Sequence, residues 1–140
     1  MNLEEVLINK CIEHYKSLNG EKKFFSDSEK YGKLPSRLII VYCDAIRRTE
    51  HHYKTIPQRC WLYENSVLKE QNINLEDDEA NQQNGIFYST ASARFYWDLD
   101  KGKAFLGIMF GPRFGRGFSY SIKQNGRDFI LDDEDIEWVS

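Results

Sequence analysis

The sequence holds little of what marks a secreted or membrane-spanning protein. Its three cysteines, Cys11, Cys43 and Cys60, have no CxxC spacing, and such a sparse, odd set predicts reduced structural thiols in the cytoplasm. Residues 1–5 contain no basic side chain, so the basic start of a secretory signal is missing. No apolar run approaches the roughly 20 residues that cross a bilayer. These absences predict a soluble cytoplasmic protein with no membrane partner.

Catalytic and metal-binding motifs are also lacking. The sequence has no GxSxG nucleophile motif, and the glycine-rich residues 111–117 show neither the GK[ST] ending of a P-loop nor GxGxxG spacing. The adjacent pair His51-His52 has no HxxxH spacing and no nearby cysteine pair, so we expect no metal. Cys43 stands in an apolar run, where a thiol is not activated. The sequence therefore predicts no enzyme and no cofactor.

Charge and size are ordinary for a small globular protein. The net charge of −3 gives the molecule as a whole no attraction for nucleic acid. A chain of 140 residues with 41% hydrophobic residues predicts a single domain, residues 1–140, with one core. The aromatic content of 14% favours a well-populated sheet.

Residues 3–18 predict an amphipathic helix, because apolar side chains recur at steps of three and four. Asn2 is expected to cap its start, and Asn19-Gly20 to end it. His14 lies at the edge of the apolar stripe. It could act as an acid or base if a carboxylate faced it, but an inert boundary position is the preferred interpretation.

The middle of the chain is less regular. Residues 21–35 are polar and predict a loop, and the apolar run at 38–43 predicts a buried strand. Residues 44–60 leave two alternatives open, a short helix or an irregular crossing broken at Pro57. The polar residues 64–84 predict a mobile excursion.

From residue 85 onward the pattern is that of strands joined by tight turns. Apolar side chains alternate along residues 87–99, and Asp100-Lys101-Gly102 and Asn125-Gly126 are typical turn sequences. Further strands are expected at residues 104–110, 118–122 and 128–131, with a glycine-rich connection at 111–117 and with 136–139 extending or ending the last strand. The predicted class is α+β, with the N-terminal helix packed on a curved antiparallel sheet whose concave face could hold a pocket.

Carboxylates cluster near the C-terminus. Asp132, Asp133, Glu134 and Asp135 follow one another, and such a surface complements basic partners and speeds their association. A solvated acidic turn is the open alternative. A calcium loop is not indicated, because the glycine that would interrupt alternating oxygen ligands is missing.

Arg113 and Arg116 are a second candidate for protein binding. Both stand in the glycine-rich residues 111–117 and could hold an acidic partner. A structural turn is the preferred interpretation, since no helix follows whose N-terminus could meet an anion.

Residues 87–140 carry a pattern of turns and aromatics. It consists of a strand that ends at Phe110-Gly111-Pro112, then Gly115, Gly117, an aromatic strand at 118–120 and a final Trp138-Val139-Ser140. This pattern resembles a group of small bacterial proteins with a nuclear-transport-factor-2-like (cystatin-like) cone. Such proteins are often similar to immunity proteins, which bind and block a toxin made by their own cell.

The expected function is therefore a non-catalytic, intracellular protein-binding module, most specifically an immunity protein that neutralises a cognate bacterial toxin. The alternative is a small-molecule-binding protein or an enzyme that uses the cone pocket. Asp98, Asp100, His14, Tyr96 and Tyr120 have the side chains for acid–base chemistry. A deep pocket with a buried carboxylate would favour the enzyme, and a filled interior with acidic outer patches would favour the binding module.

Overall fold

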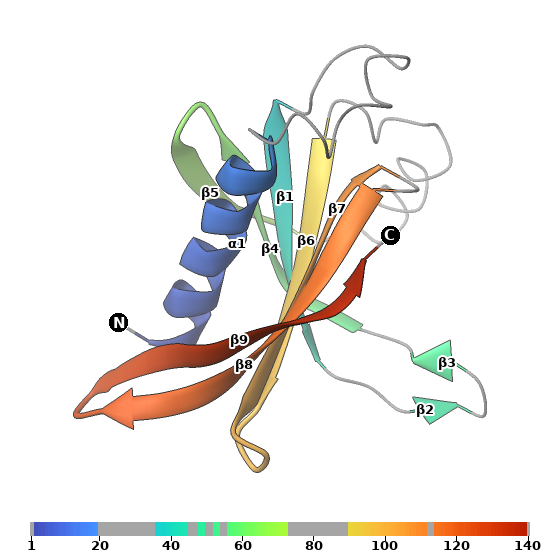
Figure 1. Cartoon of the computed structure of the whole chain (residues 1–140). Coiled ribbons are helices and arrows are strands. Elements are labelled where there is room, and N and C mark those ends of the chain that lie inside the picture. The colour runs from blue at the N-terminus through green and yellow to red at the C-terminus, as the bar shows by residue number, and fades with distance from the viewer. Residues whose placement is uncertain are drawn as a thin grey trace.

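One helix, α1 (Leu3–Asn19), lies against one face of a curved sheet (Figure 1). The structure, a computed structural model, describes residues 2–19, 36–44, 48–49, 52–53, 56–72, 90–111 and 114–139. Its strands are β1 (Arg37–Asp44), β2 (Arg48–Thr49), β3 (His52–Tyr53), β4 (Ile56–Glu64), β5 (Val67–Gln71), β6 (Thr90–Asp98), β7 (Lys103–Gly111), β8 (Phe114–Asn125) and β9 (Asp128–Val139). The predicted α+β class is confirmed. The loop predicted at 21–35 lies outside the described residues.

Helix α1 begins and ends close to where the sequence predicts. The backbone N–H of Glu5 donates to Oδ1 of Asn2 at 2.8 Å, so Asn2 is the expected cap. The predicted apolar stripe is buried, with Leu7 and Cys11 at 0% exposure. Within the described residues no helix is long and apolar enough to cross a membrane.

The main sheet is mixed, which corrects the antiparallel sheet predicted above. Its strand order is β5-β4-β1-β6-β7-β8-β9. All neighbouring strands run antiparallel except β1 and β6, which run parallel with Leu38 opposite Ala91. The chain builds β4 and β5 on one side of β1 and then returns to the other side, a long crossover of the kind that parallel pairs require.

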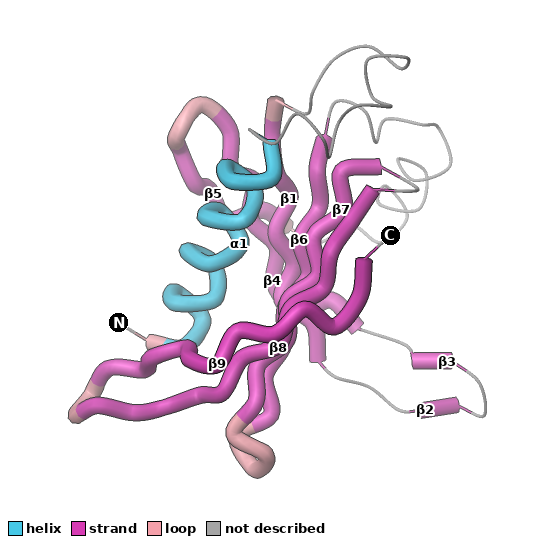
Figure 2. Tube along the Cα trace, in the orientation of Figure 1, coloured by secondary structure: helices cyan, strands magenta, loops and turns pink. Residues whose placement is uncertain are grey.

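The C-terminal part is the antiparallel meander that the sequence predicts. Strands β6 to β9 follow one another across the sheet (Figure 2). The sheet is not closed, since β5 and β9 stand at the two ends of its order. The nuclear-transport-factor-2-like cone therefore stays a prediction.

In the middle of the chain, strands occupy parts of two segments, 44–60 and 64–84, where the sequence predicted no strand. β4 contains Pro57, opposite Cys43, at a point where the pairing register with β1 shifts. A shift of this kind is one of the few places where a sheet accepts proline. β5 occupies part of the predicted excursion at 64–84, and Asn65 and Ser66 turn the chain with φ of 53° and 62°.

The prediction of a connection at 111–117 is wrong for residues 115–117. Gly115, Arg116 and Gly117 belong to β8, which runs from Phe114 to Asn125. The predicted extension of the last strand is confirmed, because β9 continues to Val139.

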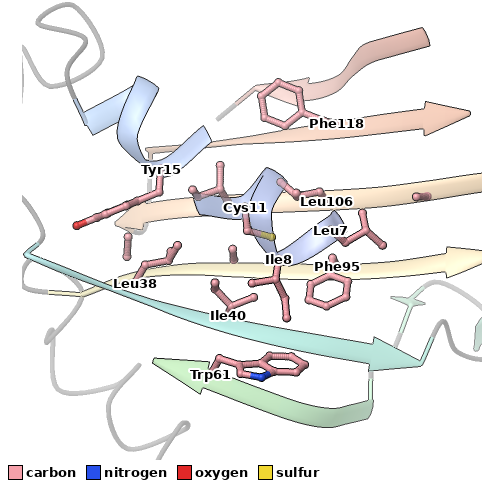
Figure 3. Close-up of a cluster of buried hydrophobic side chains, with 14 of the residues drawn as sticks. Leu7, Ile8, Cys11, Tyr15, Leu38, Ile40, Trp61, Phe95, Leu106 and Phe118 are labelled. Atoms are coloured by element: carbon pink, nitrogen blue, oxygen red, sulfur yellow. The ribbon is translucent and has the colours of Figure 1, made fainter. Parts of the chain in front are cut away.

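Side chains fill the space between α1 and the inner face of the sheet. Leu7 and Cys11 of α1 face this core (Figure 3). Strands β1, β6 and β7 contribute Ile40, Phe95 and Ile108, each with 0% exposure. Most of the concave face is thus occupied by the protein's own helix and core, and a cavity remains at its edge, between α1 and β9.

Candidate functional site

The predicted acidic residues lie on β9, an edge strand of the sheet. Asp132, Asp133 and Asp135 are exposed. Asp133 has a φ of 52°, and the register between β8 and β9 shifts beside it. The acidic run is therefore a bulged strand and not a turn, and a bulge of this kind redirects the side chains next to it.

Glu134, the fourth predicted carboxylate, contacts the core side of the sheet. The hydroxyl of Tyr120 donates to its Oε1 at 2.7 Å. Nε2 of His14 lies 3.0 Å from the same oxygen and 2.5 Å from the Tyr120 oxygen. The three side chains, one each from α1, β8 and β9, form a polar triangle that joins the helix to the edge strand.

One arrangement of protons satisfies all three contacts. Nε2–H of His14 donates to the Tyr120 oxygen and toward Glu134, while the Tyr120 hydroxyl donates to Glu134. The imidazole also stacks on Phe118, with ring centroids 3.9 Å apart. Tyr120 is 1% exposed, whereas the side chains of His14 and Glu134 are 13% and 48% exposed. The triangle links α1 to β8 and β9, and all three of its side chains line a cavity.

Burial governs the electrostatics of the triangle. It raises the pKa of Tyr120, and the hydrogen bond to the negative Glu134 raises it further. Burial also lowers the pKa of His14, and this effect outweighs the attraction of Glu134. The imidazole is therefore neutral near pH 7, where its ordinary pKa of about 6.5 would leave a partial charge.

A cavity of about 320 Å³ opens beside the triangle. Lys10 and Glu13 of α1 line one side, and Asp132 and Asp133 of β9 line the other. Lys10 and Glu13 contact each other at 3.4 Å, and Lys123 reaches Asp132 at 3.1 Å. The Lys123 contact lowers the pKa of Asp132, so this carboxylate stays negative.

Protonation of His14 is expected to destabilise the protein. The pKa of His14 in the folded state is below its ordinary value, so the unfolded chain binds the proton more readily. The charged groups that face the imidazole are Lys10, Glu13 and Glu134, with Tyr120 between them. The contribution of His14 is complete above about pH 6.5 and is lost as the pH falls through the folded-state pKa.

Denaturant unfolding between pH 7.5 and 5 measures this loss. The free energy of unfolding should fall on acidification in the native protein and fall less in the variant His14→Gln. The variant Glu134→Gln should move the NMR titration of His14 to lower pH, because Glu134 is the stronger of the two carboxylates that raise this pKa. Equal pH slopes for the native protein and His14→Gln would contradict the assignment.

The two predicted arginines do not join the acidic residues. Arg113 lies outside the described residues. Arg116 is half-buried on β8 opposite Val139, whereas Asp132 lies opposite Ser121. These positions are five residues apart along β8, or about 16 Å of strand. Arg116 and the acidic cluster are therefore separate features.

A second cavity, of about 450 Å³, lies on the outer face of the sheet, away from α1. Sequence reasoning did not predict it. Its lining includes Arg94, Tyr96, Phe105, Gly107, Glu137 and Trp138. The glycines that predicted a connection instead form the floor on which the Trp138 ring lies, since a Cβ at Gly107 or Gly117 would come within 3.0 or 2.0 Å of it.

The other proposed acid–base residues are dispersed. Oδ1 of Asp98 accepts the backbone N–H of Lys101 and holds the β6–β7 turn. Tyr96 stacks on Phe105 of the neighbouring strand, with ring centroids 4.9 Å apart. Of the residues named for acid–base chemistry, the structure brings only His14 and Tyr120 together, with Glu134 as the carboxylate that faces them.

Neither Cys11 nor a cluster of metal ligands offers a reactive site in the described part of the chain. Cys11 is buried, and burial raises the pKa of its thiol, which makes it a poor nucleophile. Among the described residues no three His, Cys, Asp or Glu side chains are placed to hold a metal ion. His51 lies outside these residues.

The chain matches no protein family, and neither a curated protein nor a solved structure is detectably similar to it. The resemblance of residues 87–140 to small bacterial cone proteins stays a prediction.

Proposed function

We propose that the protein is a non-catalytic module that binds a basic protein partner, with the outward carboxylates of β9 as its contact surface. The observation that carries this proposal is the exposure of Asp132, Asp133 and Asp135 on an edge strand. Carboxylates gathered in this way steer a positively charged partner toward β9 and fix its orientation.

The filled interior supports binding by contact over chemistry in a pocket. The space between α1 and the sheet is occupied by side chains such as Leu7 and Phe95. Glu134 is 48% exposed and is not the buried carboxylate that an enzyme in the cone would need. The buried Tyr120 hydroxyl supports a structural role for its contacts with His14 and Glu134.

The finer form of the proposal is an immunity protein that acts inside the cell and neutralises a cognate bacterial toxin. Its support is the acidic β9 together with the resemblance of residues 87–140 to small bacterial cone proteins. A toxin that acts on nucleic acid would carry basic side chains to meet the phosphates of its substrate. An acidic protein can cover such a surface with complementary charge.

Charge reversal on β9 tests the contact surface. The double variant Asp132→Lys/Asp135→Lys should slow association with the partner about tenfold or more at low salt and flatten the salt dependence of the rate. Asp133 is left in place, because its positive φ is tolerated better by aspartate than by lysine. The partner is first captured from lysate of the source organism and then purified, and its association is followed by stopped flow.

The matched control is Glu64→Lys/Asp100→Lys, which changes the net charge equally on β4 and in the β6–β7 turn. Its association rate should fall less than that of the β9 variant. If both variants slow association to the same extent, net charge and not β9 directs binding, and the proposed contact surface is wrong.

A further inference from the structure

The outer face of the sheet carries a trough at the level of residue 107. The register places Arg94, Gly107, Gly117 and Trp138 in one row across β6, β7, β8 and β9. Alternate residues of a strand point to opposite faces. Ala104 and its even-numbered neighbours on β7 are buried toward α1, so Gly107 belongs to the outer face. The two glycines in the middle of the row have no side chains, and the Trp138 ring lies over them.

Aromatic side chains form its walls. The Trp138 ring extends from β9 over Gly117 and Gly107 and is 42% exposed. Tyr96 and Phe105, which are register partners, stack on each other along one side. The resulting cavity of about 450 Å³ falls in the range of natural binding pockets.

The two ends of the trough differ in charge. Arg94 lines the end at β6, and Glu137 lines the end at β9. Glu137 is held by the Ser119 hydroxyl, which donates to its Oε1 at 2.5 Å. Asp135 is the register partner of Ser119, which is itself opposite Phe105. The rim at β9 is therefore acidic and continues the outward carboxylates of the proposed contact surface.

We propose that this trough receives an aromatic side chain of the partner protein, flanked in the partner's sequence by lysine or arginine. The inference rests on the proposed function and adds the chemistry of the group that anchors the partner. The partner's ring would stack on the exposed side of the Trp138 ring, beside the Tyr96 and Phe105 rings. The flanking basic side chains would meet Glu137 and Asp135.

Charge complementarity along β9 selects this occupant over others. A second copy of this chain would bring its own acidic β9 against Asp135 and Glu137, and like charges at such close range repel. A neutral aromatic small molecule would use the walls of the trough but not the acidic rim. Interfaces commonly concentrate their affinity in an aromatic anchor that fills a pocket beside charged residues.

The pentapeptide acetyl-Lys-Lys-Trp-Lys-Lys-amide probes the trough directly, with the native full-length chain and two-dimensional NMR as the readout. The backbone amide signals of Gly107 and Gly117 should shift on titration, and those of Gly102 and Gly126, which lie in turns, should not. Replacing the tryptophan of the peptide with alanine should weaken binding at least about tenfold. Replacing its lysines with glutamate should abolish binding.

Two outcomes would overturn the proposal. If the Gly107 and Gly117 signals do not move, the trough does not take the ring. If free indole binds as tightly as the peptide, the trough is a small-molecule site and the acidic rim plays no part. Neither outcome depends on a variant that has to fold.

Binding of the captured partner separates this inference from the proposed function. Trp138→Ala should lower the affinity for the partner at least about tenfold. Ile130 is the control, because it is a similarly exposed apolar residue on β9, at 45%. Ile130→Ala should change the affinity less than twofold. Normal binding by Trp138→Ala together with slow association by Asp132→Lys/Asp135→Lys would reject the trough and keep the proposed function. Normal binding by all of these variants would reject both.

Discussion

Replacing Phe95 with alanine is expected to lower the free energy of unfolding by about 3–5 kcal/mol. Phe95 has 0% exposure on β6, in the centre of the sheet. Its ring packs against Trp61 and Tyr42, with centroids 6.1 and 5.5 Å apart. Removing it leaves a cavity between β1, β4 and α1 that the close-packed neighbours cannot fill. Urea denaturation followed by circular dichroism measures the change.

Phe105→Ala is the matched control on the neighbouring strand. Phe105 is half-buried on the outer face, where it stacks on Tyr96. Its loss should lower the free energy of unfolding by about 1–2 kcal/mol, because the side chain is only partly buried and makes one aromatic pair. Equal costs for the two variants would mean that the interior beneath α1 is loosely packed. A loosely packed interior would leave room for a functional pocket beneath α1.

The parts of the fold that follow a local pattern could be predicted from the sequence. The apolar spacing of α1 predicted both its limits and its buried face, because a helix of this length buries one stripe. Alternation along β6 predicted that Ala91, Ala93 and Phe95 are buried. Asp98 and Gly102 form the predicted β6–β7 turn, with Gly102 at a φ of 62°.

The parts that depend on distant partners could not be predicted. Pro57 argued against a strand, and only the register shift opposite Cys43 explains why β4 accepts it. Asn65-Ser66 lacks the glycine that usually marks a two-residue turn, so β5 was missed. The parallel pairing of β1 with β6 joins segments separated by two other strands, and no local pattern records which side of β1 the chain returns to.

The candidate site shows the same division. The sequence predicted the acidic run but could not tell which carboxylate contacts the core. That choice depends on the bulge at Asp133, and it places Glu134 against His14 and Tyr120. From the sequence, acid–base chemistry required a carboxylate facing His14. Glu134, which lies 120 positions away in the chain, faces it. The outer trough left no recognisable pattern in the sequence. Gly107 and Gly117 are neighbours across β7 and β8 but lie ten positions apart in the chain.

Gly117→Ala should destabilise the protein by about 1–3 kcal/mol. A Cβ at this position would lie 2.0 Å from Nε1 of Trp138, far inside the contact distance, so the indole has to leave its place. Gly107→Ala should cost less, since its Cβ would lie 3.0 Å from the Cζ2 atom at the edge of the same ring. Thermal unfolding measures both changes, and tryptophan fluorescence reports the displacement of the ring.

A double-mutant cycle with Trp138→Ala decides whether the ring causes the cost. With the indole removed, Gly117→Ala should become neutral or stabilising by about 0.5–1 kcal/mol, because alanine loses less backbone entropy than glycine in a strand. The sign of the effect therefore reverses between the two backgrounds. A cost that persists without Trp138 would place the strain in the backbone of β8. Reversal would establish that Gly117 is needed to seat Trp138, the wall on which the proposed aromatic anchor of the partner depends.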